Sequence, residues 1–145
     1  MFTGLIREIG TLRSKTAAGG VARLRIHAPD SAPGLGLGDS LAVNGICLTV
    51  TARQGALVTV EAAAETRRLT TLEGWRAGER LHLEPALQAG QTLDGHLVQG
   101  HVDGVGKILS RRKAGASWFV TVGLPRELAQ YLAPKGSVAV DGVSL

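Results

Sequence analysis

The chain has 145 residues, which suits one ordinary domain or two small ones. Its residues are 44% hydrophobic and 19% charged, the balance of a soluble globular protein, and no uncharged apolar run is long enough to span a membrane. The N-terminus lacks the apolar core of a signal peptide, so we expect a cytoplasmic location. The single cysteine, Cys47, cannot form a disulfide within the chain, which agrees with a reducing compartment.

A net charge of +4 raises the question of nucleic-acid binding. The basic residues are scattered, and only residues 67–68 and 111–113 form clusters. Two Phe, two Trp and one Tyr are few for the aromatic platforms on which single-stranded bases stack. We therefore expect a solvated basic surface and neither a nucleic-acid nor a membrane partner.

Alternating apolar residues predict short β-strands through the first half of the chain. The clearest is 21–27, where Ala22, Leu24 and Ile26 alternate with other residues. Further strands are predicted at 5–12, 40–43, 46–52, 57–61 and 81–84, with a short helix at 62–69 and a glycine- and proline-rich connection at 29–38. Because no long helix is available for parallel crossovers, these elements predict an antiparallel barrel or sandwich.

Glycines mark two special backbone positions in this half. Asn44-Gly45 stands between two predicted strands, and it suits a two-residue hairpin because both central positions take a positive φ. Gly10 lies inside the first predicted strand, where it indicates a bulge or a close approach of other atoms.

From about residue 97 the same pattern starts again. The stretch 40–48 is matched without a gap by 137–145, at an offset of 97 (137 − 40). Residues 105–108 and 118–122 likewise repeat strands of the first half, and 126–132 predict a short helix. A repeat at a fixed offset gives the number of structural units. We expect a domain at 1–96 and a partial second domain at 97–145.

The second copy stops at the counterpart of Leu48. A whole second unit would end near residue 193 (96 + 97), so roughly 48 residues of the repeat are missing. We therefore expect a truncated chain or a shortened gene product. The strand edges left open in a half-barrel would be available for pairing with another chain.

Four motifs stand in series along the chain. They are Met1-Phe2-Thr3-Gly4, the octapeptide VNGICLTV at 43–50, Glu65-Thr66-x-Arg68-x-Thr70, and Gly95-His96-x-Val98-x-Gly100-His101-Val102-Asp103-Gly104. With the internal repeat they resemble the riboflavin synthases of the lumazine-binding repeat family, over essentially the whole chain. The resemblance implies an all-β fold of tandem six-stranded Greek-key antiparallel β-barrels with short helices, here with the second barrel incomplete.

The resemblance also implies an activity. In the family, two molecules of 6,7-dimethyl-8-ribityllumazine exchange a four-carbon unit to give riboflavin and 5-amino-6-(ribitylamino)uracil, with no redox cofactor or metal. Each barrel binds one lumazine, and the active site forms between barrels of two subunits in a homotrimer held by a C-terminal helix. The alternatives are a non-catalytic lumazine- or flavin-binding protein, or a fragment that only binds and self-associates in another way. Whether this chain alone is active is left open.

By resemblance, His101, Ser40 and Cys47 occupy catalytic positions. Imidazole titrates near neutrality, so we expect His101 to transfer a proton or orient the ligand; taken alone, it would more often be a turn residue. Ser40 and Cys47 are candidates for supplying a nucleophile or holding a bound hydroxide. We favour positioning for Ser40, because an unactivated serine is a weak nucleophile. Cys47 on its own would usually be a small buried apolar residue.

Further residues are implied in substrate binding. They are Phe2, Gly45, Thr49, Ala62, Ala64, Thr66 and His96, with Lys135 and Ser137 in the second, incomplete pocket. Several have plainer alternatives: Phe2 as apolar cover, Thr66 as a helix cap, and His96 as a structural hydrogen-bonding residue. His96 and His101 are not expected to hold a metal, because no third ligand cluster accompanies them.

Overall fold

The computed structural model describes all 145 residues and divides them into two compact units. The first contains Met1–Val102 together with Ser137–Leu145, and the second contains Asp103–Gly136. None of the helices has both the length and the apolar character needed to cross a membrane. The domain boundary at residue 96 follows the sequence repeat and stays a prediction.

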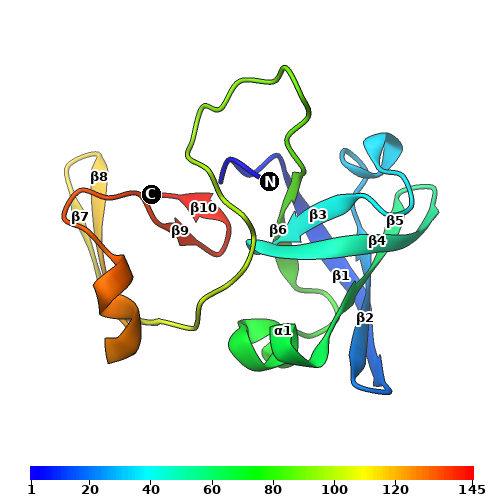
Figure 1. Cartoon of the computed structure of the whole chain (residues 1–145), viewed down its shortest axis with the longest axis horizontal. Helices are drawn as coiled ribbons and strands as arrows, with labels where there is room; N and C mark the ends of the chain where they lie inside the picture. Colours follow the sequence, from blue (N-terminus) through cyan, green and yellow to red (C-terminus); the bar gives the residue numbers. More distant parts are fainter. The chain divides into compact units, whose positions relative to one another are not determined.

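A closed barrel of six antiparallel strands forms most of the first unit (Figure 1). In chain order the strands are β1 (Glu8–Ala18), β2 (Val21–His27), β3 (Ser40–Val43), β4 (Ile46–Gln54), β5 (Leu57–Ala62) and β6 (Arg80–Pro85). Around the barrel the order is β1, β2, β5, β4, β3 and β6, and β6 closes onto β1. Strands β3 to β5 are successive hairpins and β6 returns beside β3, which is the Greek-key order. The predicted Greek-key barrel is confirmed for the first copy.

Alternation along the strands places one apolar stripe from each strand inside the barrel. In β2 the predicted residues Ala22, Leu24 and Ile26 are all buried. The other strands add Leu12, Leu41, Val43, Ile46, Leu48, Val50, Val58, Val60, Leu81 and Leu83. Full burial of one Leu, Ile or Val side chain contributes about 1.5–3 kcal/mol, so this interior supplies most of the driving force for folding the unit.

The β3–β4 turn has the predicted geometry. Asn44 and Gly45 have φ values of +47° and +79°, so both central positions lie in the left-handed region, as a two-residue hairpin requires. This turn sets the register in which Ser40 pairs with Thr49 and Ala42 with Cys47.

The first strand differs from its prediction. It begins at Glu8, not at residue 5, and continues to Ala18 because β1 and β2 stay paired up to the Gly19-Gly20 turn. The close approach predicted at Gly10 is present, since a Cβ there would lie 2.4 Å from Leu83 Cδ1. The irregularity in the β1–β2 pairing lies further along, between Leu12 and Ser14.

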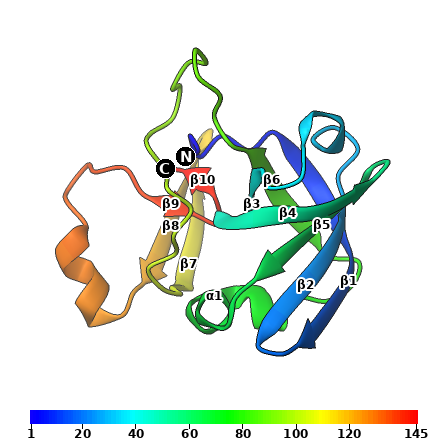
Figure 2. The same cartoon turned by 45° about the vertical axis from the view of Figure 1, so that its right-hand side comes forward.

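Short helices fill the connections. Helix α1 (Ala64–Leu69) lies within the predicted range and is followed by the 3-10 helix η2 (Thr71–Gly74). A 3-10 turn, η1 (Ala32–Gly34), interrupts the connection predicted at 29–38. Figure 2 shows α1 at the end of the barrel where β5 leaves it. The helix therefore follows β5 directly and contacts β2 and η2.

The second unit consists of one hairpin and a short helix. Strand β7 (Lys107–Ala114) pairs with β8 (Ser117–Gly123), and the 3-10 helix η3 (Arg126–Tyr131) follows. None of its residues is buried, and Trp118 and Phe119 of β8 are 53% and 57% exposed. The predicted strand and short helix are both present, the helix in the 3-10 form.

The end of the chain adds a very short hairpin to the first unit. Strands β9 (Ala139–Val140) and β10 (Val143–Ser144) flank Asp141-Gly142, whose φ values of +47° and +83° match those of the β3–β4 turn. The second copy thus contributes two separate two-stranded sheets and no closed barrel. The prediction of an all-β fold with an incomplete second barrel is confirmed.

Candidate active site

Three residues predicted for the site share the outer face of β3 and β4. Leu48 of β4 points into the barrel. Because side chains alternate along a strand, the neighbouring cross-strand pairs, Ser40 with Thr49 and Ala42 with Cys47, face outward. The hairpin therefore presents two hydroxyl groups and a thiol on one surface, with Gly45 at its turn.

The link from β5 into α1 borders this face. Thr49 pairs with Glu61 of β5, and Ala62 follows directly, with its own side chain buried. Ala64 then begins α1. The chain between Ala62 and Ala64 therefore leaves the barrel next to the strand that carries Thr49, and the use of its backbone groups in binding stays a prediction.

Thr66 lies inside α1 and does not cap it. The N-cap is Ala63, which makes no side-chain hydrogen bond, so the helix-cap alternative for Thr66 is wrong. The capping residue is Thr70, whose hydroxyl donates to the Thr66 carbonyl at 2.7 Å and accepts from the Leu72 N–H at 3.3 Å. This pair of bonds explains the spacing of the two threonines in the third sequence motif, since Thr70 joins α1 to η2.

Ion pairs hold the charged residues of this helical link. The Arg68 guanidinium donates to the Glu65 carboxylate at 2.5 and 3.0 Å, and these bonds lower the pKa of Glu65 and raise the pKa of Arg68. The Arg67 guanidinium bonds Glu73 and lowers the pKa of that carboxyl in the same way. The Glu65 and Glu73 carboxyls are therefore ionised at neutral pH. The Glu65–Arg68 pair lies within α1, and the Arg67–Glu73 pair joins α1 to η2. The lowered pKa of each carboxyl makes it a poor proton donor at neutral pH.

Residues 95–102 bring the histidine motif onto the same unit. The Cys47 N–H donates to the Gly100 carbonyl at 2.8 Å. Gly100 has a φ of +82°, and a Cβ there would lie 2.6 Å from Cys47 Cβ, so only glycine permits this approach. His101 follows directly and is exposed. The structure thus places His101 one residue from a backbone contact with Cys47.

His96 has a structural partner. Its backbone N–H donates to the Thr3 carbonyl at 3.1 Å, and its ring Nδ1 lies 2.7 Å from the Ser144 hydroxyl. Which of these two side-chain groups donates depends on the histidine tautomer. These contacts favour the structural alternative for His96, and its role in substrate binding stays a prediction.

Phe2, Lys135 and Ser137 have other surroundings. Phe2 is fully buried against Ala42 and Val98, so its contacts are those of apolar packing. Lys135 belongs to the second unit and is exposed. Ser137 is exposed at the start of the last segment of the first unit. Their roles in binding stay predictions.

The two copies of the repeated hairpin touch within the first unit. A Cβ on Gly45 would lie 2.6 Å from the Gly142 nitrogen, and a Cβ on Gly142 would lie 2.7 Å from the Gly45 nitrogen. The contacts around them are reciprocal. The Ser144 N–H donates to the Gly4 carbonyl at 2.7 Å, just as the Cys47 N–H of β4 donates to the Gly100 carbonyl. The copies are therefore related by an approximate two-fold axis.

This reciprocity gives roles to Gly4 and Ser144 that the sequence analysis did not predict. The signal was present in the repeat, because Gly4 stands 96 residues before Gly100 (100 − 4) and Cys47 stands 97 before Ser144 (144 − 47). A second reciprocal contact joins Phe2 and Val98, which bond each other's backbone at 2.7 and 3.0 Å.

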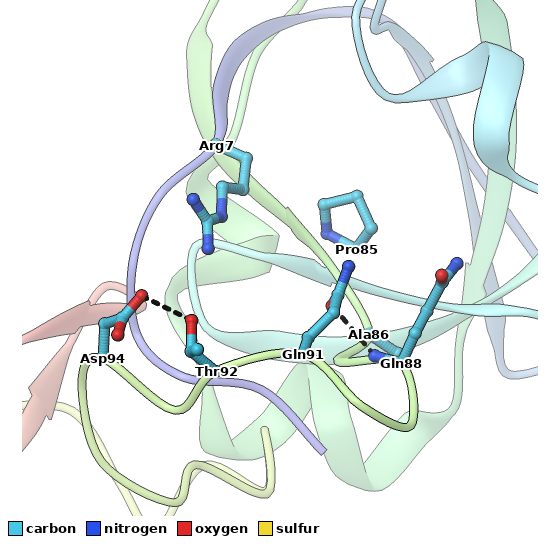
Figure 3. A pocket seen from close by; sticks show the side chains of 7 residues that line it. All are labelled: Arg7, Pro85, Ala86, Gln88, Gln91, Thr92 and Asp94. Atoms are coloured by element: carbon cyan, nitrogen blue, oxygen red, sulfur yellow. Dashed lines mark hydrogen bonds between the residues drawn. The ribbon is translucent and has the colours of Figure 1, made fainter.

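A shallow depression of about 560 Å³ lies beside the end of β6 (Figure 3). Its walls are Arg7, Pro85, Ala86, Gln88, Gln91, Thr92 and Asp94. The Thr92 hydroxyl donates to Asp94 at 2.9 Å and the Gln88 N–H donates to the Gln91 side chain at 3.0 Å, so several of its polar groups bond one another. It contains none of the predicted site residues. No three His, Cys, Asp or Glu side chains meet in the structure as metal ligands would.

Comparison with known families identifies the class of protein. The sequence matches the lumazine binding domain model over residues 3–86 and 99–145, which covers both copies of the repeat. Two crystal structures of LumP share the fold: the complex with riboflavin has a TM-score of 0.89 at 23% identity over 99% of this chain and 78% of LumP. The complex with 6,7-dimethyl-8-(1'-D-ribityl) lumazine has a TM-score of 0.86 at 21% identity, over 100% of this chain and 78% of that one. The chain is built from lumazine binding domains.

Curated relatives narrow the class. The chain is 41% identical over 146 residues to riboflavin synthase of Mycobacterium bovis, which covers 100% of the chain and 73% of the relative. It is 43% identical over 151 residues to riboflavin synthase of Brucella abortus, covering 100% and 74% respectively. Against riboflavin synthase of Bacillus subtilis it is 40% identical over 145 residues, covering 100% and 67%. The chain belongs to the riboflavin synthase family.

Proposed function

We propose that the chain functions as a riboflavin synthase. It converts two molecules of 6,7-dimethyl-8-ribityllumazine into riboflavin and 5-amino-6-(ribitylamino)uracil by transfer of a four-carbon unit. The observation that carries the proposal is the outer face of β3 and β4, where Ser40, Cys47 and Thr49 lie together. His101 follows the residue that bonds the Cys47 backbone. Relatives that are 40–43% identical over the whole chain support the reaction.

The reaction asks for few ionisable groups. A proton leaves a methyl group that the heterocycle makes acidic, and the second lumazine must be activated by a nucleophile. Holding two reactants in the correct orientation contributes up to roughly 7–11 kcal/mol. Two like substrates need two like surfaces, and a chain that encodes one hairpin twice suits that need.

The roles divide between proton transfer and ligand positioning. His101 transfers the proton or orients the ligand, because its imidazole is exposed and it follows Gly100, which bonds the Cys47 backbone. Cys47 and Ser40 supply a nucleophile or hold a hydroxide, with positioning favoured for Ser40. The lumazine ring and ribityl chain bind at Phe2, Gly45, Thr49, Ala62, Ala64, Thr66 and His96, with Lys135 and Ser137 at the second surface.

The intact protein acts in the cytoplasm as a homotrimer, without a nucleic-acid or membrane partner. Only a closed first barrel is present here, while the second copy forms two separate hairpins. This observation favours a second candidate function, in which the chain binds one lumazine and does not turn it over.

Incubation with 6,7-dimethyl-8-ribityllumazine separates the two functions. Riboflavin formation is followed by absorbance while ligand fluorescence reports binding. Product together with binding supports the synthase, and binding without product supports the binding function. If neither is observed at ligand concentrations up to the millimolar range expected of weak sites, both functions are wrong.

A histidine pair tests the assignment of His101. We expect His101→Ala to lower turnover by about 10²-fold or more, the contribution typical of a general acid or base, and to weaken lumazine binding much less. His27→Ala is the matched control, because His27 lies in β2 away from the β3–β4 face. Equal loss of turnover and binding in His101→Ala would reduce this residue to a scaffold role.

A further inference from the structure

The most buried carboxylate of the first unit lies on the outside of the barrel. Glu84 of β6 pairs with Ala42 of β3, on the outward face of the sheet, yet it is only 4% exposed. The N-terminal residues cover it, and no arginine or lysine forms an ion pair with it. A buried carboxylate without a cation requires hydrogen-bond donors to stabilise it.

Three donors come from two consecutive residues. The Thr3 N–H and the Thr3 hydroxyl both donate to Glu84 Oε1 at 2.7 Å, and the Gly4 N–H donates to Oε2 at 3.0 Å. Thr3 is itself only 1% exposed. Bonds to a charged acceptor are stronger than bonds between neutral groups. Glu84 therefore fixes the backbone of the N-terminal segment against β6.

Thr3 and Gly4 in turn bond two further segments, one at His96 and one at Ser144. The Thr3 carbonyl accepts from the His96 N–H at 3.1 Å, and the Gly4 carbonyl accepts from the Ser144 N–H at 2.7 Å. The His96 ring meets the Ser144 hydroxyl between them. The Glu84 carboxylate of β6 is therefore linked by hydrogen bonds, through residues 3–4, to the His96–Ser144 pair.

We propose that Glu84 is the positioning residue of the lumazine site: it orders the N-terminal segment, and that segment orders His96, Ser144 and the approach of Gly100, which precedes His101, to β4. The inference rests on the proposed function for its effect on turnover. Its effect on local order is independent of that function, because the bonds involve the chain's own backbone.

The chain contains a matched control in Glu8. This carboxylate is 7% exposed and accepts the N–H groups of Asp30 and Ser31 at 3.2 and 2.8 Å. It resembles Glu84 in burial and in accepting backbone donors, and it has no bond to residues 2–4, to the histidine segment or to the second hairpin. In Glu84→Gln and in Glu8→Gln, the new amide N–H₂ faces an N–H donor, which removes a bond and leaves that donor unsatisfied.

The test is hydrogen exchange by NMR at the amides of Phe2, His96, Val98 and Ser144, with the barrel amides of Leu24 and Val60 as reference. In Glu84→Gln we expect exchange at the first four to become about tenfold faster while the reference amides keep their rates. In Glu8→Gln the four amides keep their wild-type rates. Equal acceleration at all six amides in Glu84→Gln, or none at the first four, overturns the proposal.

Two further variants complete the test. Thr3→Val replaces Glu84→Gln in the test if Glu84→Gln does not fold. It removes the hydroxyl bond and keeps the Glu84 charge, so we expect a smaller acceleration of exchange at the same four amides. Glu84→Asp keeps the charge and partly restores protection. Turnover is measured in parallel, with an expected loss of about tenfold in Glu84→Gln and little change in Glu8→Gln. If the wild type is active and the two Gln variants have equal turnover, the proposal is also overturned. If the wild type neither binds nor converts lumazine, the proposed function is wrong, and the exchange rates alone test the role of Glu84.

Discussion

Strands β2 and β8 hold equivalent places in the two copies, yet their environments are opposite. Leu24 of β2 is 0% exposed, whereas Val120 of β8, 96 residues later (120 − 24), is 49% exposed. Apolar residues alternate with other residues in β2, and β8 is also rich in apolar residues, with Trp118, Phe119, Val120 and Val122. The difference is in their neighbours: β2 pairs with β1 and β5, while β8 pairs only with β7. Alternation thus predicts a strand, and burial depends on the strands available to cover it.

The largest expected effect comes from truncating the two equivalent side chains. Leu24→Ala should lower the free energy of unfolding by about 2–5 kcal/mol, because it opens a cavity in the barrel interior. Val120→Ala should change it by less than about 0.5 kcal/mol, because the side chain is already half exposed. Urea unfolding followed by circular dichroism measures both. Similar losses in the two variants would show that β8 is buried in solution.

A smaller effect is expected where the two copies meet. Gly45→Ala places a Cβ at a φ of +79° and 2.6 Å from the Gly142 nitrogen, so it combines backbone strain with a clash. Gly55→Ala is the matched control, because Gly55 has a φ of +57° and open space around it. The control should cost about 1–2 kcal/mol of unfolding free energy, the usual cost of a left-handed residue, and Gly45→Ala should cost more.

Unfolding of both glycine variants in urea gives the comparison. If they lose the same free energy, the contact between the hairpins adds nothing to stability. A larger loss in Gly45→Ala shows that the two hairpins pack closely in solution, because only close packing makes the added Cβ clash.

The smallest effect is electrostatic and confined to the first copy. Arg67 lowers the pKa of Glu73 in the folded chain, so the pair stabilises the fold above the ordinary pKa range of glutamate. That contribution is lost as the pH falls through the lowered pKa, where the folded carboxyl is protonated. Glu73→Gln should therefore be slightly less stable than wild type at pH 7 and equal to it in acid. Thermal unfolding from pH 7 to pH 2 measures the difference, and a difference that grows toward low pH would contradict the pairing.

The barrel could be predicted because its signals are local. The strict alternation of Ala22, Leu24 and Ile26 and the Asn44-Gly45 turn each determine a short stretch of backbone. The outward direction of Ser40 and Thr49 follows from the same alternation once the hairpin register is known.

The long-range contacts could not be predicted in this way. The bonds from Thr3 and Gly4 to Glu84 join residues about 80 positions apart, and nothing in either local sequence indicates the other. The helix-cap alternative for Thr66 was wrong because the neighbouring threonine, Thr70, makes the capping bonds. The start of β1 was also misplaced, since Leu5 and Ile6 are apolar enough to suit a strand but lie before its pairing begins.

The proposed function depends most on the outer face of β3 and β4 as the lumazine surface. An NMR titration of the labelled chain with 6,7-dimethyl-8-ribityllumazine tests this directly, because each backbone amide reports its own surroundings. We predict saturable shifts at residues 40–49, 62–66 and 100–101, with one lumazine bound per first barrel. Saturable shifts confined to β7 and β8, or no saturable shifts at all, would contradict it.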